Sequence, residues 1–378
     1  MNVTGATETI NAQNSETLEE KAEQEQARRE AQERARQEAI AAAPFVSVSI
    51  QSSGIHPSTS RMITVDVVTL SPTFEPVETF HAVLNSNSDP GPFHLHGVTP
   101  AEFSSAKKFG QILKSLDRLI DGRTLLIHNV ARGWGFIVSE AKRAMNDAAR
   151  ANRSNARGNR RGGRGRRRQR VGHIPRPRVL VDTLASARRQ GIVLDDVRIR
   201  GVAHTLGLNA SPAQASVERA QTPHQELCRE ETLLVGEIYA TLAAAGPIAE
   251  IDPAALRPDK FGLQRTAIRV QAQEATPNLV NPGVYEPGKS LIEGMEVVVA
   301  PEIEMDPDII IQACVDSNLA YSEKLTRQTS VVVCNQTRDI DGKAMHAQRK
   351  GIPLLSDVAF MAAVERIKEG QKLPAESS

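Results

Sequence analysis

Alternating apolar and polar positions mark three short strands in the first half of the chain. Residues 45–50 alternate apolar side chains with Ser, and β-rich runs follow at 61–70 and 79–84. Gly, Pro, Ser and Asn separate the three runs, as in the turns between consecutive strands. The pattern predicts an antiparallel meander.

Helical and strand patterns then alternate. Helical spacing of apolar residues and short apolar runs predict six further elements, which are helices at 101–120 and 136–149, a strand at 124–127, a strand or strand-to-helix passage at 179–184, and helices at 199–206 and 223–245. Strands followed by helices and further strands build an α/β domain with a mixed sheet. We place this domain at residues 45–245.

The last third of the chain changes character twice. Residues 246–290 contain six prolines and little periodicity, which predicts a linker. Order returns over residues 291–368, before a tail at 369–378. Strands are expected there at 296–300, 330–334 and 353–355, and helices at 308–317, 342–350 and 358–367. The alternation predicts a small α/β domain with a parallel sheet.

The first 44 residues are polar and charged. Residues 1–14 lack a pattern and are expected to be disordered, whereas 15–43 contain neither Gly nor Pro and begin with a capping box at Thr17 and Glu20. Leu18 and Ile40 are the only large aliphatic residues of this helix. It is therefore expected to be a solvated single helix or spacer, with a coiled-coil dimer as the alternative.

Composition limits the setting in which the protein works. No run approaches the roughly 20 apolar residues of a membrane span, and the N-terminus lacks the basic and apolar regions of a signal peptide. Cys228, Cys314 and Cys334 show neither paired spacing nor a zinc pattern, so we expect reduced, buried thiols. We expect no membrane partner and a cytoplasmic location, with association with the nucleoid as one form of it.

The net charge of +1 conceals a strongly basic segment. Between Ala148 and Arg178 there are twelve arginines and no acidic residue, which gives this segment +12 and leaves −11 for the rest of the chain. Interspersed glycines and the scarcity of aliphatic residues predict an arginine-rich loop, 148–178, inserted in the α/β domain. Its central arginines are Arg153, Arg157, Arg160, Arg161, Arg164, Arg166, Arg167, Arg168 and Arg170.

Arginine pairs with phosphate in a bidentate manner, so these nine residues are the predicted nucleic-acid contacts. No aromatic residue lies among them, which removes base stacking as a source of sequence preference. The segment is thus expected to bind DNA or RNA without sequence specificity. Docking of an acidic protein and a purely solubilising role are the alternatives.

Five short motifs along the first domain carry a family resemblance. They are VSIQSSGIHP at 48–57, HGVT at 96–99, LIHN at 126–129, VDTL at 181–184 and PHQEL at 223–227. In this order they resemble the DNA polymerase III epsilon-type 3′–5′ exonucleases, which carry four acidic metal ligands and a histidine general base. The resemblance implies a ribonuclease H-like exonuclease fold.

The resemblance also shows which residues should carry the chemistry. It places the four metal-binding carboxylates at Ser49, Gln51, Gly133 and Arg229, and the general base at His224. Two-metal phosphodiester cleavage needs oxygen ligands of negative charge. Four carboxylates contribute −4, whereas Ser, Gln, Gly and Arg contribute +1, and each unit at ~4 Å is worth about 4 kcal/mol at an effective dielectric near 20.

We therefore expect no metal ion, no cofactor and no catalysis at these positions. His224 is expected to serve only as part of a helix N-terminus, in which Thr222 is the capping residue and Pro223 takes the first helical position. For Arg229 two outcomes are open. It either binds an anion such as phosphate or pairs internally with Glu226 or Asp182.

The C-terminal domain resembles a BRCT domain. The matching segments are GMEVVV at 294–299, TSVVV at 329–333, GKAMHA at 342–347, and GIPLLS at 351–356 with Phe360. In phosphate-binding BRCT domains a Ser/Thr-Gly pair acts together with a helix lysine. Here Lys343 is the phosphate candidate, but Ala300 and Pro301 replace its partners. The resemblance implies a protein partner for this domain, or contact with DNA ends.

The sequence thus predicts a catalytically inactive, exonuclease-like nucleic-acid-binding scaffold in DNA replication or repair. One alternative is an active 3′–5′ exonuclease with relocated ligands, which would need Mg²⁺ or Mn²⁺. The other is a protein–protein adaptor that does not bind nucleic acid.

Overall fold

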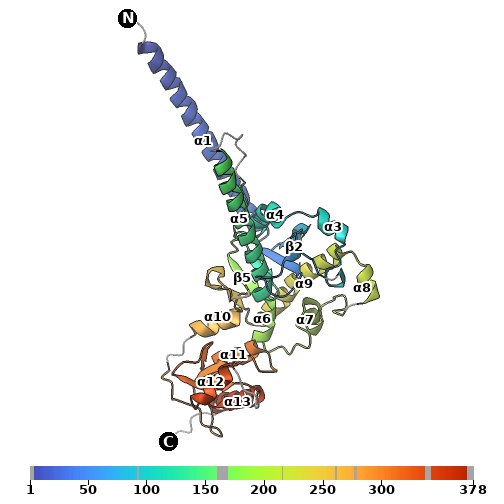
Figure 1. The fold of residues 1–378 in the computed structure, drawn as a ribbon, viewed down its shortest axis with the longest axis vertical. Coiled ribbons are helices and arrows are strands. Elements are labelled where there is room, and N and C mark those ends of the chain that lie inside the picture. The colour runs from blue at the N-terminus through green and yellow to red at the C-terminus, as the bar shows by residue number, and fades with distance from the viewer. Residues whose placement is uncertain are drawn as a thin grey trace.

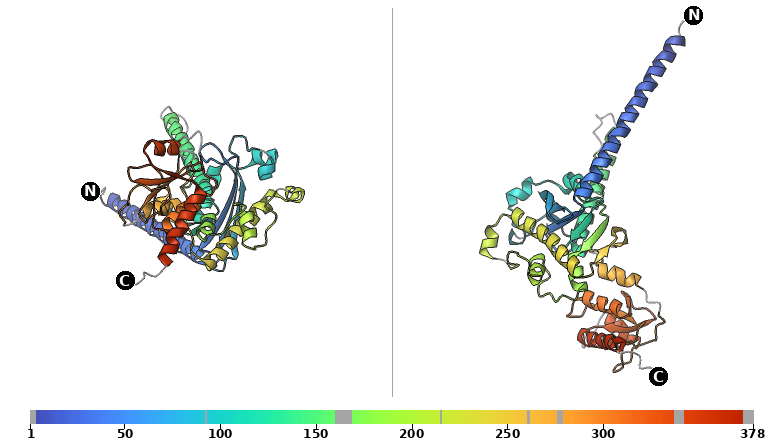
Figure 2. Two further views of the ribbon diagram at one scale, coloured as in Figure 1. Left: turned by 90° about the horizontal axis from the view of Figure 1, so that it is seen from below. Right: turned by 180° about the vertical axis from the view of Figure 1, so that it is seen from behind.

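A computed structural model describes residues 4–91, 93–159, 169–214, 216–259, 262–275, 279–336 and 342–372. The chain forms an α/β domain and a smaller C-terminal α/β domain, and a long helix projects from the first (Figure 1). The helix and the C-terminal domain lie at opposite ends of the molecule (Figure 2).

The larger domain is built on a six-stranded mixed sheet in the order β3-β2-β1-β4-β5-β6. Its strands are β1 (Phe45–Ser52), β2 (Met62–Leu70), β3 (Pro76–Val83), β4 (Thr124–Ile127), β5 (Val179–Asp182) and β6 (Glu250–Ile251). β1, β2 and β3 form an antiparallel meander, β4 and β5 run parallel to β1, and β6 is antiparallel to β5. The meander followed by two parallel strands is the arrangement of the ribonuclease H-like exonuclease fold, as the motifs imply.

Helices cover both faces of this sheet, and β1 presents apolar side chains to one layer and serines to the other. The elements are α2 (Phe93–His96), α3 (Pro100–Ser105), α4 (Phe109–Ile120), α5 (Val130–Asn159), α6 (Thr183–Arg189), α7 (Ile199–Thr205), α8 (Val217–Gln221) and α9 (His224–Ala245). Val46 and Val48 of β1 belong to the core cluster that contains α4 and α5. Ser49, on the opposite face, is hydrogen-bonded to Thr232 of α9.

The projecting helix is α1 (Thr4–Ala42), so it begins before the expected start at Ser15 and includes residues for which we predicted disorder. Its C-terminal end is fixed by the buried Arg123, whose Nε donates to the Ala43 carbonyl at 2.7 Å and whose Nη2 donates to that of Ala39 at 3.1 Å. From residue 23 onwards almost every side chain of the helix is exposed.

The prediction of a linker over residues 246–290 is wrong for three short elements between residues 250 and 274. β6 extends the sheet, η1 (Pro253–Ala255) follows, and α10 (Ala267–Glu274) packs into the core through Ile268 and Val270. The prolines lie beside these short elements, where they need no backbone hydrogen bond. Their number concealed the apolar residues between them.

The C-terminal domain contains a four-stranded, wholly parallel sheet in the order β10-β9-β7-β8. Its elements are β7 (Glu296–Val299), α11 (Pro307–Asp316), β8 (Ala320–Ser322), β9 (Thr329–Val333), α12 (Gly342–Arg349), β10 (Leu354–Leu355) and α13 (Asp357–Lys372). The sequence predicts all of them except β8, whose three residues are too few for an alternating pattern.

The two domains share one continuous apolar core. α11 of the second domain packs against α6 and α10 of the first. Arg188 of α6 forms ion pairs with Asp306 and Asp308, and Arg269 of α10 lies 3.3 Å from Asp308. Because Asp308 is almost fully buried, these two arginines supply the charge that its carboxylate needs inside the interface.

The arginine-rich insert starts later than predicted. α5 continues as a helix to Asn159, so residues 148–159 belong to that helix rather than to a loop. At the base of the insert, Asn152 and Gln169 form two reciprocal hydrogen bonds of 2.9 and 2.8 Å. The outgoing helix and the returning chain are therefore clamped together at a defined point.

Candidate functional site beneath helix α9

Ser49 lies beneath α9 in a closed network of hydrogen bonds. Its hydroxyl is 2.7 Å from the hydroxyl of Thr232 and donates to the carbonyl of Cys228 at 3.2 Å. All three residues are buried, and Thr232 is fully inaccessible. Two positions further along β1, Gln51 accepts a hydrogen bond from Thr64 across the strand pair.

Arg229 points from α9 to the neighbouring strand and forms a bidentate ion pair there. Its Nε and Nη2 lie 2.8 and 3.0 Å from the two carboxylate oxygens of Asp66. Asp66 is directly opposite Ser49 in the β1–β2 register and is completely buried. Of the two outcomes expected for Arg229, internal pairing is the one found, with Asp66 in place of Glu226 or Asp182.

Asp66 also accepts a hydrogen bond from His81 of β3, at 3.1 Å. Burial pushes the pKa of the Asp66 carboxyl upward, but the hydrogen bonds from His81 and Arg229 outweigh burial and hold the pKa below its ordinary value. The carboxylate is therefore ionised and already has cationic and polar partners. Its lone pairs face these neighbours rather than an open position.

The predicted general-base position, His224, is the first residue of α9. Its ring centroid is 5.4 Å from that of His81, and its Nδ1 is 4.0 Å from Glu102 of α3. Burial and the charge of His81 lower the pKa of His224, which Glu102 offsets only in part. The helix starts one residue later than expected, because Pro223 is its N-cap rather than its first residue, and it caps the helix without a side-chain hydrogen bond.

Gly133, the third ligand position of the resemblance, lies in the first turn of α5. A Cβ atom added there would come within 2.6 Å of Cδ1 and 2.9 Å of Cγ1 of Ile127, the last residue of β4. Arg132 beside it reaches across to Ser52 of β1, with 3.0 Å between Nη2 and the hydroxyl oxygen. This end of the sheet is thus filled by an isoleucine side chain and a guanidinium group.

Asp182, a residue of the VDTL motif, has a structural role. Its two oxygens accept hydrogen bonds from the backbone N–H groups of Asn129, Val130, Leu184 and Ala185. It therefore caps α6 and fixes the start of α5 at once. His128 next to it bonds to Thr183 and to the Val197 carbonyl, both at 2.8 Å.

The predicted nucleic-acid contacts lie along the insert. Arg153 on α5 and Arg170 on the returning chain have exposed side chains. Arg157 is in the helical part, and the remaining six, Arg160, Arg161, Arg164, Arg166, Arg167 and Arg168, lie outside the described residues. Near the base of the insert, Asp117, Asp121 and His173 form a compact group of possible metal ligands.

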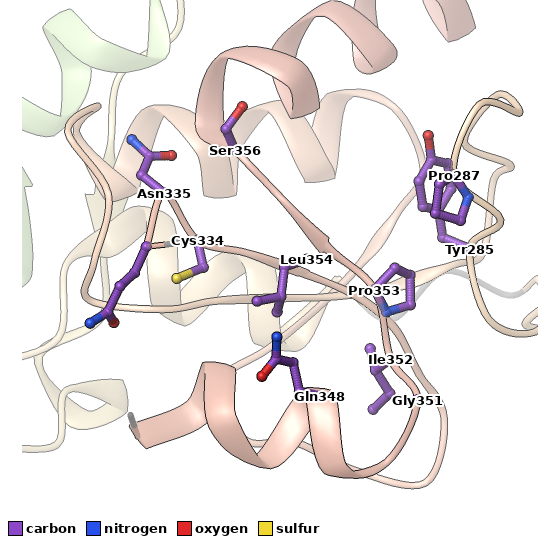
Figure 3. A pocket seen from close by; sticks show the side chains of 11 residues that line it. Tyr285, Pro287, Cys334, Asn335, Gln348, Gly351, Ile352, Pro353, Leu354 and Ser356 are labelled. Atoms are coloured by element: carbon purple, nitrogen blue, oxygen red, sulfur yellow. The ribbon is translucent and has the colours of Figure 1, made fainter. Parts of the chain in front are cut away.

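In the C-terminal domain Lys343 is half-buried at the start of α12. Its Nζ donates to the carbonyl of Val299, the last residue of β7, at 3.2 Å, and burial lowers its pKa. A separate cavity of about 630 Å³ lies between α12 and the segment before β7, where Gln348, Leu354 and Tyr285 face it (Figure 3). Lys343 does not line this cavity.

The motifs failed to identify Asp66, the acidic residue that pairs with Arg229 at the site. One signal of its role was present, because an Asp inside the apolar run of β2 has to find a partner when the strand is buried. Its partner Arg229 is 163 positions away, and only the fold brings the two together.

No family model matches the chain, and no curated protein matches it. Among solved structures it is similar to exonuclease X bound to 5′-overhanging duplex DNA, with 12% identity, a TM-score of 0.32, and coverage of 52% of this chain and 92% of that one. It is also similar to exonuclease I, with 13% identity, a TM-score of 0.34, and coverage of 52% of this chain and 40% of that one. For NrnC of Brucella melitensis the identity is 13%, the TM-score is 0.30, and the coverage is 54% of this chain and 74% of that one. The fold assignment therefore rests on the sheet topology.

Within the described ranges, none of the helices is both long enough and apolar enough to span a bilayer.

Proposed function

We propose that this protein is a catalytically inactive, exonuclease-like scaffold that binds nucleic acid through its arginine-rich insert. The observation that carries the first half of the proposal is the ion pair between Arg229 and Asp66. A two-metal nuclease needs several free carboxylates around one reacting phosphate. Here a guanidinium group occupies a fourth-ligand position and neutralises the neighbouring acid.

The surroundings of this pair support the same proposal. Ser49 is closed off by Thr232 and Cys228, and at Gly133 any added side chain would require Ile127 to shift. An active 3′–5′ exonuclease with relocated Mg²⁺ or Mn²⁺ ligands is the alternative. Asp66 is its best candidate ligand, but that residue would first have to lose Arg229 and His81.

Nuclease assays test the absence of catalysis. The intact protein should degrade neither single-stranded DNA nor mismatched 3′ ends with Mg²⁺ or Mn²⁺, at protein concentrations equal to that of the substrate. Turnover that disappears in an Asp66→Asn variant would establish the alternative. Turnover that persists in that variant would indicate a contaminating nuclease, which purification through a second affinity step would remove.

The insert supports the second half of the proposal. The chain enters the insert along α5 and rejoins the domain at the clamp formed by Asn152 and Gln169, so the two described ends of the insert lie together. Each arginine that contacts phosphate releases counterions, so affinity should fall steeply with salt. An adaptor that uses the insert to hold an acidic protein is the remaining alternative.

Anisotropy titrations with labelled DNA and RNA separate these two functions. Replacing the nine central arginines by Gln keeps the length of the insert and should remove most of the affinity. Nine phosphate contacts to a single strand would give a log–log salt slope of about −6, which should flatten in this variant. A matched control replaces Arg28, Arg29, Arg34 and Arg36 of α1 by Gln. Equal affinity of the wild-type protein and the insert variant would rule out the insert as the nucleic-acid contact, whereas absence of binding by the wild-type protein would favour the adaptor.

We further propose that the C-terminal domain is BRCT-like and contacts a protein partner. The strand order β10-β9-β7-β8 with all strands parallel supports this, as do the motifs at β7, β9 and α12. The Lys343 ammonium group already donates to Val299, so phosphopeptide binding would require it to change partners. On this view the protein acts in the cytoplasm on DNA during replication or repair.

A further inference from the structure

Three metal-ligating side chains converge where the arginine-rich insert rejoins the domain. Asp117 and Asp121 are one turn apart at the C-terminal end of α4, and His173 lies three residues after Arg170 on the returning chain. One ligand atom from each of the three residues lies within 4.8 Å of the other two. His173 Nε2 is 2.7 Å from Asp121, and its Nδ1 is 3.3 Å from Asp117.

Backbone hydrogen bonds hold the two carboxylates in place. The N–H of His173 donates to Asp117 at 2.9 Å, and that of Arg176 donates to Asp121 at 2.7 Å. The chain approaches so closely that a Cβ atom on Gly172 would be 2.0 Å from an oxygen of Asp117. Groups of this kind, fixed by outer hydrogen bonds, are typical of ligands oriented before a metal ion arrives.

One oxygen of the group has no partner. The side chain of Asp117 is nine-tenths buried, and its Oδ1 is buried without a hydrogen-bond partner, whereas Oδ2 faces His173. A buried carboxylate oxygen left in this state costs free energy unless a hydrogen-bond donor or a cation satisfies it. Burial and the nearby Asp121 raise the pKa of Asp117, although His173 opposes the shift.

We propose that Asp117, Asp121 and His173 bind one divalent transition-metal ion, with Zn²⁺ the best match to the donor set. Both oxygens of Asp117, one oxygen of Asp121 and one imidazole nitrogen of His173 supply four donor atoms from three protein ligands, and water can complete the site. With a neutral imidazole the three groups carry −2, which the ion balances. The adjacent Arg176 is exposed, so solvent screens its repulsion of the ion.

The competing arrangement is a protonated His173 that bridges both carboxylates. It satisfies the ring nitrogens but leaves Asp117 Oδ1 without a partner. A metal ion can reach Oδ1 and Oδ2 together by bidentate binding, which a ring N–H cannot do. In either arrangement Asp117, Asp121 and His173 attach the returning chain to α4. In the metal-bound arrangement the strength of this attachment also depends on the concentration of the metal ion. This site stands independently of the proposed nucleic-acid function.

Calorimetric titration of the full chain with ZnCl₂, after removal of any affinity tag, tests the site. We expect one ion per chain and, at 100 times Kd, a rise in Tm of about 5 °C that EDTA reverses. Asp121→Asn and His173→Gln should abolish both effects. Asp195→Asn and His204→Gln, which change exposed residues elsewhere, should retain them.

Long-range ¹H–¹⁵N spectra of the nine histidines provide a readout that requires no variant to fold. Addition of Zn²⁺ should shift the ring nitrogens of His173 and leave those of His81 and His224 in place. The proposal is wrong if Zn²⁺ produces neither heat nor a Tm shift. It is equally wrong if Asp121→Asn binds with unchanged affinity, or if the shifts occur on other histidines.

Discussion

Arg229 on α9 and Asp66 on β2 face each other in a bidentate ion pair, with the carboxylate fully buried and the guanidinium group about one quarter exposed. Removal of the arginine leaves a buried charge whose remaining charged or polar partners include His81. Arg229→Met should therefore lower the free energy of unfolding by about 3 kcal/mol. Denaturant titration measures this loss.

A double-mutant cycle isolates the pair from the rest of α9. Asp66→Asn combined with Arg229→Met removes both charges, and it should cost clearly less than the sum of the two single changes. Strict additivity would mean that the two side chains do not interact in solution. Lys substituted for Arg229 should recover only part of the loss, because a single ammonium group cannot make both hydrogen bonds.

Introduction of a carboxylate at the third ligand position should damage the fold rather than restore cleavage. In Gly133→Asp the new Cβ meets Ile127, so we expect a loss of about 1–3 kcal/mol from overpacking. The second variant combines Gly133→Asp with Ile127→Val, which removes the Cδ1 methyl group that the new Cβ approaches most closely. This variant should regain part of the lost stability. Neither variant should cleave DNA. An unchanged melting temperature in the single variant would contradict the contact.

His128 should make stability depend on pH between 4 and 6.5. Burial lowers its pKa from 6.5 to about 4, although the hydrogen bond to Val197 opposes the shift. Between these two pKa values His128 binds a proton in the unfolded chain but not in the folded chain. The free energy of unfolding therefore falls as the pH falls, by at most about 3 kcal/mol. The measurement is the unfolding free energy at pH 7 minus that at pH 5, in wild type and in His128→Gln.

In His128→Gln this difference should shrink, and the exposed His204→Gln serves as the control, in which it should not change. If wild type and His128→Gln have the same pH dependence, the imidazole titrates normally in the folded protein.

Asp182→Asn should lower the free energy of unfolding, although the side chains of Asp and Asn have the same shape. Oδ1 of Asp182 accepts three backbone hydrogen bonds and Oδ2 accepts one from Val130, so an amide group must place its NH₂ against at least one N–H donor. We expect a loss of about 1–3 kcal/mol. Asp195→Asn, at an exposed position, is the matched control and should stay within about 0.5 kcal/mol of wild type.

Arg188 should control how firmly the two domains are joined. Arg188→Met removes the ion pairs to Asp306 and Asp308 and leaves Asp308 with Arg269 as its remaining ion-pair partner in the described structure. We expect separate unfolding of the two domains in calorimetry and a larger radius of gyration in X-ray scattering. Arg198→Met breaks an exposed ion pair with Asp196 and should change neither quantity.

Local patterns were sufficient to predict most of the fold. Alternation located β1 and β2, and apolar runs located β4, β5 and β7, because each of these strands has at least one buried face. β6 and β8 were missed because they are only two and three residues long, and α10 was missed because it lies in a segment judged a linker from its prolines. The end of α5 was misplaced because Arg and Asn after Ala149 resemble a loop by composition, whereas the helix continues over them to Asn159.

The site was harder to predict than the fold because its contacts are long-range. Motif order identified Ser49, Gln51, Gly133, His224 and Arg229 as positions of interest. It could not show that Ile127 fills the space next to Gly133, or that Asp66 pairs with Arg229, since both depend on strand register. The contact between Asp117 and His173 could not be predicted either, because the two residues lie on either side of most of the insert in the sequence and meet only at its base.

The projecting helix gives the molecule a hydrodynamic character that a compact protein of this mass lacks. At 1.5 Å per residue the 39 residues of α1 extend about 58 Å, and Arg123 ties the C-terminal end of the helix to the domain. A rod on a compact body increases friction with little added mass, so the protein should sediment slowly and tumble anisotropically. A group attached at the start of α1 would be held about 58 Å from the point where the helix joins the domain.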